Sequence, residues 1–429
     1  MPTAESLRIR VAAVRAAEAP DADVALHAAA PHGQRFERRR ADIVAAAIPV
    51  LNAQGFKGMR LTAVAELTGL RATGITYYFP RKEELALACL ESGFAVFHEL
   101  LAIAEREATP RARIQRLIHL FVERDCAARE GRAPPTSSFS SIRALEDEHR
   151  ERAVEGYKQV FRRVRSLFEG PDLASLDKVS RSIRTLILLE QLYWASVWLG
   201  DYDLDEFPRL AARMTDIVSN GLACEGVPLA PEALQLGGAS EGVDAAKENF
   251  LLATTRQINA HGYRGASVDR IAASLNLTKG AFYHHNEAKD ELVAACFRRS
   301  FAIVRQAHSM ARDRGPGEWR RLVTAVTALI RYQLSADGPL LRASVLSSMP
   351  QEHQAEIVSL SYKAARKFSA MIADAIAEGS ARAVDPAVAG ALLNAAINVA
   401  SDVRMTQMAT DDRVVCDFAR PLFTGLLRP

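Results

Sequence analysis

The sequence has few cysteines and no long apolar run. Its five cysteines lie far apart and form no C-x-x-C pair, and no His/Cys group has metal-ligand spacing: Cys89, Cys126, Cys224, Cys296 and Cys416. We therefore predict no metal site and no cofactor, and we expect reduced cysteines in a cytoplasmic protein. Because no run reaches eighteen apolar residues, we expect no membrane span.

Catalytic motifs are also absent. The sequence contains no nucleophile elbow, no phosphate-binding loop and no H-E-x-x-H motif, so we predict that the protein is not an enzyme. The first 35 residues carry Arg8, Arg10 and Arg15 but no apolar signal core, and we expect residues 1–35 to form a mobile arm or a frayed helix.

Net charge is small, at +3, but it is unevenly distributed. Residues 35–82 hold nine Lys/Arg against three acids, and residues 247–289 hold six against three, so the remainder is net acidic. Local clusters of positive charge attract polyanions such as nucleic acid.

The chain repeats itself at an offset of 207 residues, without a gap from about Ala46 to Ala95. Asn52 thus matches Asn259, and Lys82 matches Lys289. A length of 429 residues exceeds one ordinary core, and the apolar residues recur at helical spacing. These features predict an all-α protein with two similar domains, joined by a Pro/Gly-containing linker at residues 225–245.

Each repeat contains the pattern of a helix-turn-helix. The segment 55–58 is expected to end a first helix, and Gly69 or its counterpart Asn276 suits a tight left-handed turn between two short helices. Ser267 and Thr278 are the expected N-caps of the second copy.

The second helix of such a pair enters the major groove of DNA with its N-terminal residues at the base edges. The predicted DNA contacts therefore lie on and beside this helix in both copies: Arg60, Arg71, Thr73, Thr76, Tyr77, Lys82, Ser267, Thr278, Lys279, Gly280, Tyr283, His284 and Lys289. A metal role for His284 and His285 is disfavoured because adjacent residues do not share a helix face. The run Arg38–Arg40 could be only a solvated charge run.

The segments "GYRGASVDRIAASLNLTKGAFYHHNEAKDEL" and "GFKGMRLTAVAELTGLRATGITYYFPRKEEL" resemble the DNA-binding head of TetR-family transcription regulators. The resemblance implies a three-helix head followed by a helical ligand-binding and dimerisation body, in two tandem units. The first head departs at Arg60, where the family usually has Ser or Thr, and at Thr73 and Thr76, where it usually has Gly and Tyr. Asn276 and Asn286 replace the usual Gly and Phe in the second head.

These expectations divide the chain into an arm (1–35), a first head (36–82), a first body (83–224), the linker (225–245), a second head (246–289) and a second body (290–429). By resemblance, the last two helices of each body would bundle against a partner. A small-molecule effector would lie between the middle helices of a body, although ordinary core packing is the alternative for each candidate residue. The candidates are Tyr157, Phe161, Tyr193, Trp194 and Trp198 in the first body, and Tyr362, Phe368, Met371, Asn394 and Asn398 in the second.

The predicted function is that of a sequence-specific, DNA-binding transcription regulator, a repressor released by a small molecule. Its partners would be a double-stranded operator, an effector, and either its own second unit in a pseudo-dimer or a second chain in a homodimer. Because the two reading helices differ, the operator should be asymmetric. Two alternatives remain: a ligand-binding or protein-interaction module whose heads have lost specific DNA recognition, and a nonspecific nucleic-acid binder.

Overall fold

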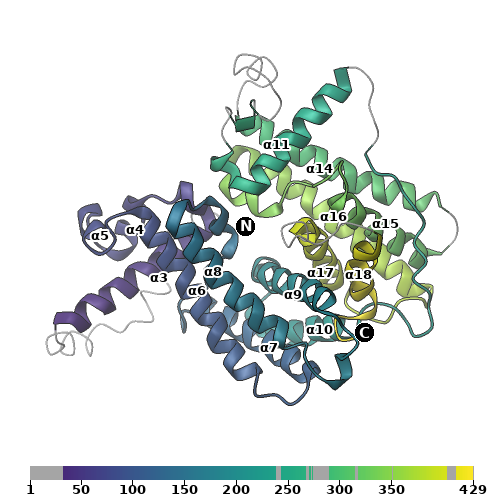
Figure 1. The fold of residues 1–429 in the computed structure, drawn as a ribbon, viewed down its shortest axis with the longest axis horizontal. Helices are drawn as coiled ribbons and strands as arrows, with labels where there is room; N and C mark the ends of the chain where they lie inside the picture. Colours follow the sequence, from purple (N-terminus) through teal and green to yellow (C-terminus); the bar gives the residue numbers. More distant parts are fainter. Residues whose placement is uncertain are drawn as a thin grey trace.

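The computed structural model describes residues 32–237, 243–266, 270, 271, 273, 289–314, 317–349, 351–402 and 412–428. Within these ranges the chain is helical, with no β-strand beyond one isolated bridge between Ala223 and Ala381. Figure 1 shows two helical units that meet at α9, α17 and α18. The predicted all-α class is confirmed for this part of the chain.

The first head consists of α3 (His32–Gly58), α4 (Leu61–Thr68) and α5 (Ala72–Tyr78). Gly55 breaks α3 with a left-handed φ of 64°, close to the predicted end of the first helix. Gly69 ends α4 with φ 67° and ψ 21°, and the amide of Leu70 bonds to Ala65 O at 2.9 Å. The left-handed turn expected at Gly69 is therefore present, since glycine adopts it without steric cost.

The first body contains α6 (Lys82–Ala104), α7 (Pro110–Arg129), α8 (Asp147–Ser166), α9 (Lys178–Trp198) and α10 (Phe207–Asn220). A short helix, η1 (Phe139–Ala144), connects α7 to α8. By length and composition α6 alone among the described helices could cross a membrane, but 61% of its most apolar stretch is buried inside the protein. Packing against α3, α7 and α8 explains the apolar character of α6.

The second unit repeats this order with α11 (Val243–Gly265), α14 (Lys289–Arg312), α15 (Glu318–Leu334), η5 (Ala343–Ser348), α16 (Gln351–Ala377), α17 (Pro386–Val399) and α18 (Asp412–Thr424). Gly262 breaks α11 with φ 73°, as Gly55 breaks α3. Cys89 and Cys296 are buried and point to the carbonyls of Val44 and Leu251 at 3.8 and 3.5 Å. The sequence repeat is thus a structural repeat down to single hydrogen bonds.

The described part of the predicted linker, residues 225–237, packs against the second body. Leu234 and Leu236 are buried in the main core. The amide of Glu232 donates to Thr324 Oγ1 at 3.0 Å, and the indole of Trp319 donates to Pro228 O at 3.2 Å. Residues 225–237 therefore pack along α15 of the second body.

The last helices of the two bodies pack against each other. The helix α9 contacts both α17 and α18, and α10 contacts α17, at the centre of Figure 1. The interface is crossed by hydrogen bonds from buried side chains: Arg184 donates to Leu426 O and Arg428 O, at 3.0 and 2.8 Å, and Gln191 faces Leu392 O at 3.4 Å. These buried contacts join the two units of one chain as a subunit interface would.

Asp177 and Asp385 add a reciprocal element to this interface. Each is the N-cap of its helix, α9 or α17. Asp177 pairs with Arg413 of α18 at 3.1 Å, and Asp385 pairs with Arg213 of α10. Each unit thus caps a helix with an aspartate that also bonds the last helix of the other unit.

Candidate nucleic-acid interface

The predicted reading helix of the first head, α5, presents its polar side chains outward. Ile75 is buried beneath it, whereas Thr73, Thr76 and Tyr77 are exposed. The spacing of these three residues places them on one helical face. Tyr77 is 71% exposed, which is unusual for a large aromatic side chain without a partner surface.

Two predicted arginines flank this face. Arg60 and Arg71 occupy the N-cap positions of α4 and α5, both are exposed, and neither side chain bonds to its helix. Ser or Thr at these positions would be held by capping, but an arginine extends away from the backbone. Both guanidinium groups can therefore reach an anionic backbone beside α5.

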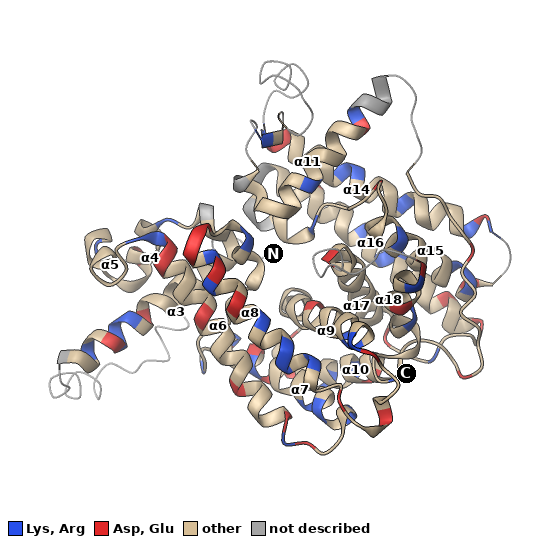
Figure 2. Cartoon of the chain, in the orientation of Figure 1, with Lys and Arg blue, Asp and Glu red and all other residues tan. Residues whose placement is uncertain are grey.

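Two arginines of the basic run 38–40 make contacts within the first head. Arg39 donates to Thr68 O at 2.9 Å, and the guanidinium of Arg40 lies 4.8 Å from the centre of the Phe79 ring. Figure 2 shows Lys and Arg, in blue, along α3. For Arg39 and Arg40 the hypothesis of a purely solvated charge run is therefore wrong, because they fix α3 against α4 and the end of α5.

Phe36 belongs to the same surface and was missed by the sequence interpretation. Its ring lies 4.8 Å from that of Tyr78 and 5.9 Å from that of Tyr77. The signal was present, since Phe36 is an aromatic residue inside a basic segment. The rings hold Tyr77 in place at the edge of the head.

Lys82 and Lys289, predicted phosphate contacts, are placed alike in the two units. The ammonium of Lys82 lies 4.8 Å from the Phe56 ring, and that of Lys289 lies 5.1 Å from the Tyr263 ring. Each lysine begins the first helix of its body, α6 or α14. A cation–π contact orients the ammonium beside the head.

The other predicted contacts of the second head lie outside the described residues. These are Ser267, Thr278, Lys279, Gly280, Tyr283 and His284.

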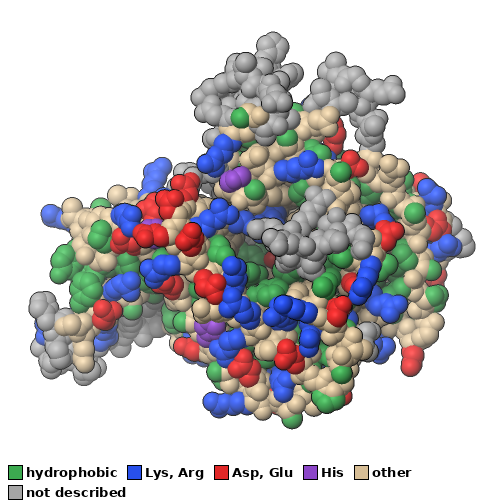
Figure 3. Space-filling model, viewed as in Figure 1, with side chains coloured by type: hydrophobic (Ala, Val, Ile, Leu, Met, Phe, Trp, Pro, Cys, Tyr) green, Lys and Arg blue, Asp and Glu red, His purple; other side chains and the backbone are tan. Residues whose placement is uncertain are grey.

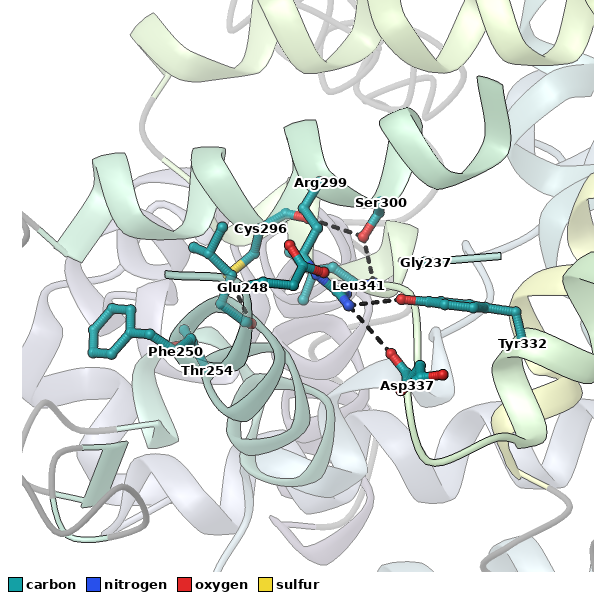
Figure 4. Close-up of polar contacts among 12 residues, drawn as sticks. Gly237, Glu248, Phe250, Thr254, Cys296, Arg299, Ser300, Tyr332, Asp337 and Leu341 are labelled. Carbon is teal, nitrogen blue, oxygen red and sulfur yellow. Dashed lines mark hydrogen bonds and ion pairs between the residues drawn. The ribbon is translucent and has the colours of Figure 1, made fainter. Parts of the chain in front are cut away.

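Buried polar contacts join the second head to its body (Figure 4). Arg299 of α14 pairs with Glu248 of α11 and donates to the Tyr332 hydroxyl at 2.6 Å and to Asp337 O at 3.2 Å. Beside it, Ser300 accepts a bond of 2.8 Å from the amide of Leu341. Arg299 is thus the centre of a network that links α11, α14 and α15.

The model of the protein family "Bacterial regulatory proteins, tetR family" matches the chain at residues 43–89 and again at 250–296. The two matches start 207 residues apart, which is the offset of the repeat. The two heads belong to the TetR family. They stand in tandem, and both are helix-turn-helix domains of the TetR type, as predicted.

Two curated TetR-type relatives are similar over part of the chain. The TetC protein of transposon Tn10 from Escherichia coli is 28% identical over 133 residues, which cover 31% of this chain and 66% of TetC. The HTH-type transcriptional regulator RutR from Escherichia coli K12 is 36% identical over 81 residues, which cover 19% of this chain and 38% of RutR. The chain thus spans less than two thirds of either relative.

Among solved structures, AibR in complex with isovaleryl coenzyme A and operator DNA is similar to one unit. The match has 16% identity and a TM-score of 0.35, and it covers 42% of this chain and 97% of AibR.

The body of the first unit brings its five predicted pocket residues onto two neighbouring helices. Tyr157 and Phe161 lie on α8 with ring centres 6.3 Å apart, and Tyr193, Trp194 and Trp198 lie on α9. Trp194 donates to Glu190 Oε1 at 2.8 Å. Burial raises the pKa of the Glu190 carboxyl and raises the pKa of Tyr157 to about 12.

One donor on this side of the first body is unsatisfied. The indole N–H of Trp198 is buried and has no acceptor among the described residues. A buried donor without a partner is costly, and a bound molecule could supply the acceptor.

The five candidates of the second body do not converge in the same way. Tyr362 is 46% exposed, and its hydroxyl lies 3.4 Å from the Asp201 carboxylate of the first unit. Phe368 and Met371 contact His308 in the core, at 4.5 Å between ring centres and 3.1 Å from Sδ to Nδ1. Asn398 donates to Asn394 O within α17.

Proposed function

We propose that the chain is a ligand-released repressor in the cytoplasm that reads an asymmetric operator with two heads of a single polypeptide, and that it is not an enzyme. The observation that carries the proposal is the interface of α9 and α10 with α17 and α18 inside one chain. Two heads held by one folded interface act as a dimer without dissociating to monomers, because the second head has a high effective concentration once the first is bound.

The exposed face of α5 supports a DNA-reading role for the first head. Arg60 and Arg71 would contact phosphates, and Thr73, Thr76 and Tyr77 would face base edges. For the second head, Lys279, Tyr283 and His284 are the proposed counterparts. Since Thr73 and Thr76 differ chemically from Gly280 and Tyr283, the two half-sites should differ in sequence.

A titration of the full chain against DNA from upstream of its own gene, with unrelated DNA of equal length as competitor, tests the proposal. We expect specific binding at least about a thousandfold tighter than nonspecific binding at physiological salt. Footprinting should then show two unlike half-sites about one helical turn apart. Equal affinity for both DNAs, or a strictly palindromic footprint, would contradict the proposal.

Variants of each head assign the half-sites. Arg71→Ala should weaken binding and lower the slope of log affinity against log salt by about one, as loss of one phosphate contact does. Thr73→Ala with Tyr77→Ala should relax specificity at one half-site, and Lys279→Ala with His284→Ala at the other. Arg111→Ala, at an exposed position on α7 of the body, is the matched control and should leave binding unchanged.

The proposed effector site of the repressor lies in the first body, beside Tyr157, Tyr193 and Trp198. Its support is the buried indole N–H of Trp198, which has no acceptor among the described residues, together with the half-buried Glu190. An effector found there should accept a hydrogen bond from Trp198, and Trp198→Phe should raise the effector concentration needed to release DNA. Failure of specific DNA binding would instead favour the protein-interaction alternative, for which the exposed ring of Tyr77 is the first surface to test.

A further inference from the structure

A cavity lies where the two heads meet the two bodies. Its walls come from four segments: the end of α3 and the helix η1 in the first unit, and the end of α11 and the region of η5 in the second. Each head touches the other unit here, since α3 contacts η5 and α11 contacts η1. The cavity has a volume of about 60 Å³ and is open to solvent, so the end of a small molecule can enter it.

The charged residues in its lining are two arginines. Arg143 lies in the last turn of η1 of the first unit and Arg342 immediately precedes η5 of the second, and no acid is among the described residues of the lining. Figure 3 shows Lys and Arg side chains gathered along the face where the two units join. A small chamber lined by one sign of charge attracts an ion of the opposite sign.

The carboxylate of Asp402, beside the cavity, bonds to both arginines. Asp402 accepts a hydrogen bond of 2.9 Å from Arg143 through one oxygen, and its other oxygen pairs with Arg342. Glu190 is a second acid near the two guanidinium groups, but among the described residues only Asp402 bonds to them. In addition, Arg342 Nε is buried without a partner among the described residues, while 12% of the side chain stays exposed.

Burial makes the charges of this cluster costly. It lowers the pKa of both guanidinium groups, most strongly that of Arg342, and it raises the pKa of the nearby Glu190 carboxyl. An added anion would stabilise the two charged arginines.

The rest of the lining is apolar or neutral. Phe56 and Tyr263, which occupy matching positions in the two heads, contribute rings, and Ile258 and Val345 contribute aliphatic side chains. The backbone of Arg342 is fixed because its amide donates to Asn259 Oδ1 at 3.1 Å.

We propose that this cavity binds a small organic anion, a carboxylate or phosphate monoester attached to a compact aromatic or branched apolar group. The anionic end pairs with Arg143 and Arg342, and the apolar group packs on Phe56 and Tyr263. Because the ligand touches both heads, it fixes their separation; this consequence for operator binding rests on the proposed function, whereas binding of the anion does not.

Calorimetric titration of the full chain with benzoate and phenyl phosphate tests the site, with benzamide as the neutral analogue of benzoate. We expect one anion per chain and an affinity for benzamide at least about tenfold weaker, since charge-assisted bonds to the arginines are lost. Inorganic phosphate carries the anionic group without the apolar group, so it should bind more weakly than phenyl phosphate. Absence of saturable binding by either aromatic anion, or equal binding of benzamide, would overturn the proposal.

Three variants and a control locate the binding. Arg342→Gln should weaken anion binding about tenfold or more, and Ala144→Leu should do so by filling the cavity while it keeps both arginines. Asp402→Asn removes the internal counter-ion and should strengthen binding, a gain that a purely structural role of the cluster does not produce. Arg413→Gln breaks an inter-unit ion pair away from the cavity lining and should change nothing.

If Arg342→Gln does not fold, as judged by its circular dichroism and melting curve, the other two variants decide. Unchanged affinity in Ala144→Leu, or weakened affinity in Asp402→Asn, would then contradict the site. Both results are read on the protein alone, so they stay separate from any failure to bind DNA.

Discussion

Asn52 and Asn259 make the same pair of hydrogen bonds in the two units. Asn52 donates to Thr136 O at 2.9 Å and accepts from the amide of Ser138 at 2.8 Å. Asn259 donates to Leu340 O at 2.9 Å and accepts from the amide of Arg342 at 3.1 Å. Each asparagine thus ties the first helix of a head to the segment between two body helices.

We expect Asn52→Ala to weaken the attachment of the first head to its body, and Asn259→Ala to weaken that of the second head. Either variant leaves a backbone amide and a carbonyl without partners, which should lower the free energy of unfolding by about 1–3 kcal/mol. Hydrogen exchange should accelerate at the Ser138 amide in the first variant and at the Arg342 amide in the second. Asn398→Ala, which removes a bond within α17, is the control and should affect neither amide. Unchanged exchange in the two test variants would show that the asparagines do not hold the heads to the bodies.

Arg184 should stabilise the interface between the units. Its guanidinium is buried, donates to two carbonyls at the end of the chain, and has a pKa lowered by burial to about 10. In Arg184→Met those carbonyls lose their donors, so we expect a loss of about 3 kcal/mol in urea unfolding and a transition that separates into two steps. Arg413→Met removes a mostly exposed pair and should cost less than about 1 kcal/mol. Equal losses would show that Arg184 has no special role.

His308 should make stability depend on pH. Burial lowers its pKa to about 4, from a model-peptide value near 6.5, because the ring is enclosed by Phe368 and Met371. Between these two values the unfolded chain binds a proton that the folded chain does not, so stability is full above about pH 6.5 and falls as the pH drops toward 4.

Urea unfolding at pH 7 and pH 5 tests the effect. His308 should account for a loss of about 2 kcal/mol between the two pH values. His308→Gln lacks this titration and should show a correspondingly smaller difference, even if its stability at pH 7 is lower. A wild-type difference no larger than that of the variant would contradict the assignment.

Much of the first head could be predicted from sequence. The glycines at 55 and 69 and the exposed positions of α5 follow from local patterns of glycine and of apolar spacing, because a short helix needs only its own residues to choose its buried face. The roles of Arg39 and Arg40 could not be predicted, since a basic run looks the same whether its side chains meet water or the carbonyl of a distant Thr68.

The effector candidates show the same limit. Aromatic residues at helical spacing could be assigned to a helix but not to a side of the bundle. Whether a ring faces a cavity, the core or the surface depends on neighbours far along the chain, as the exposed Tyr362 and the buried Phe368 show.

By itself, the sequence determined that this protein has two helical TetR-type units with basic heads, because repeats, helix caps and charge clusters are local and survive without coordinates. Only the tertiary structure decided that α9 and α17 meet inside one chain and that Arg143 and Arg342 share one aspartate. Gln191 and Leu392 are 201 positions apart and Arg143 and Asp402 are 259 apart, and no local pattern specifies such contacts; they result from the way two apolar faces pack when the units come together.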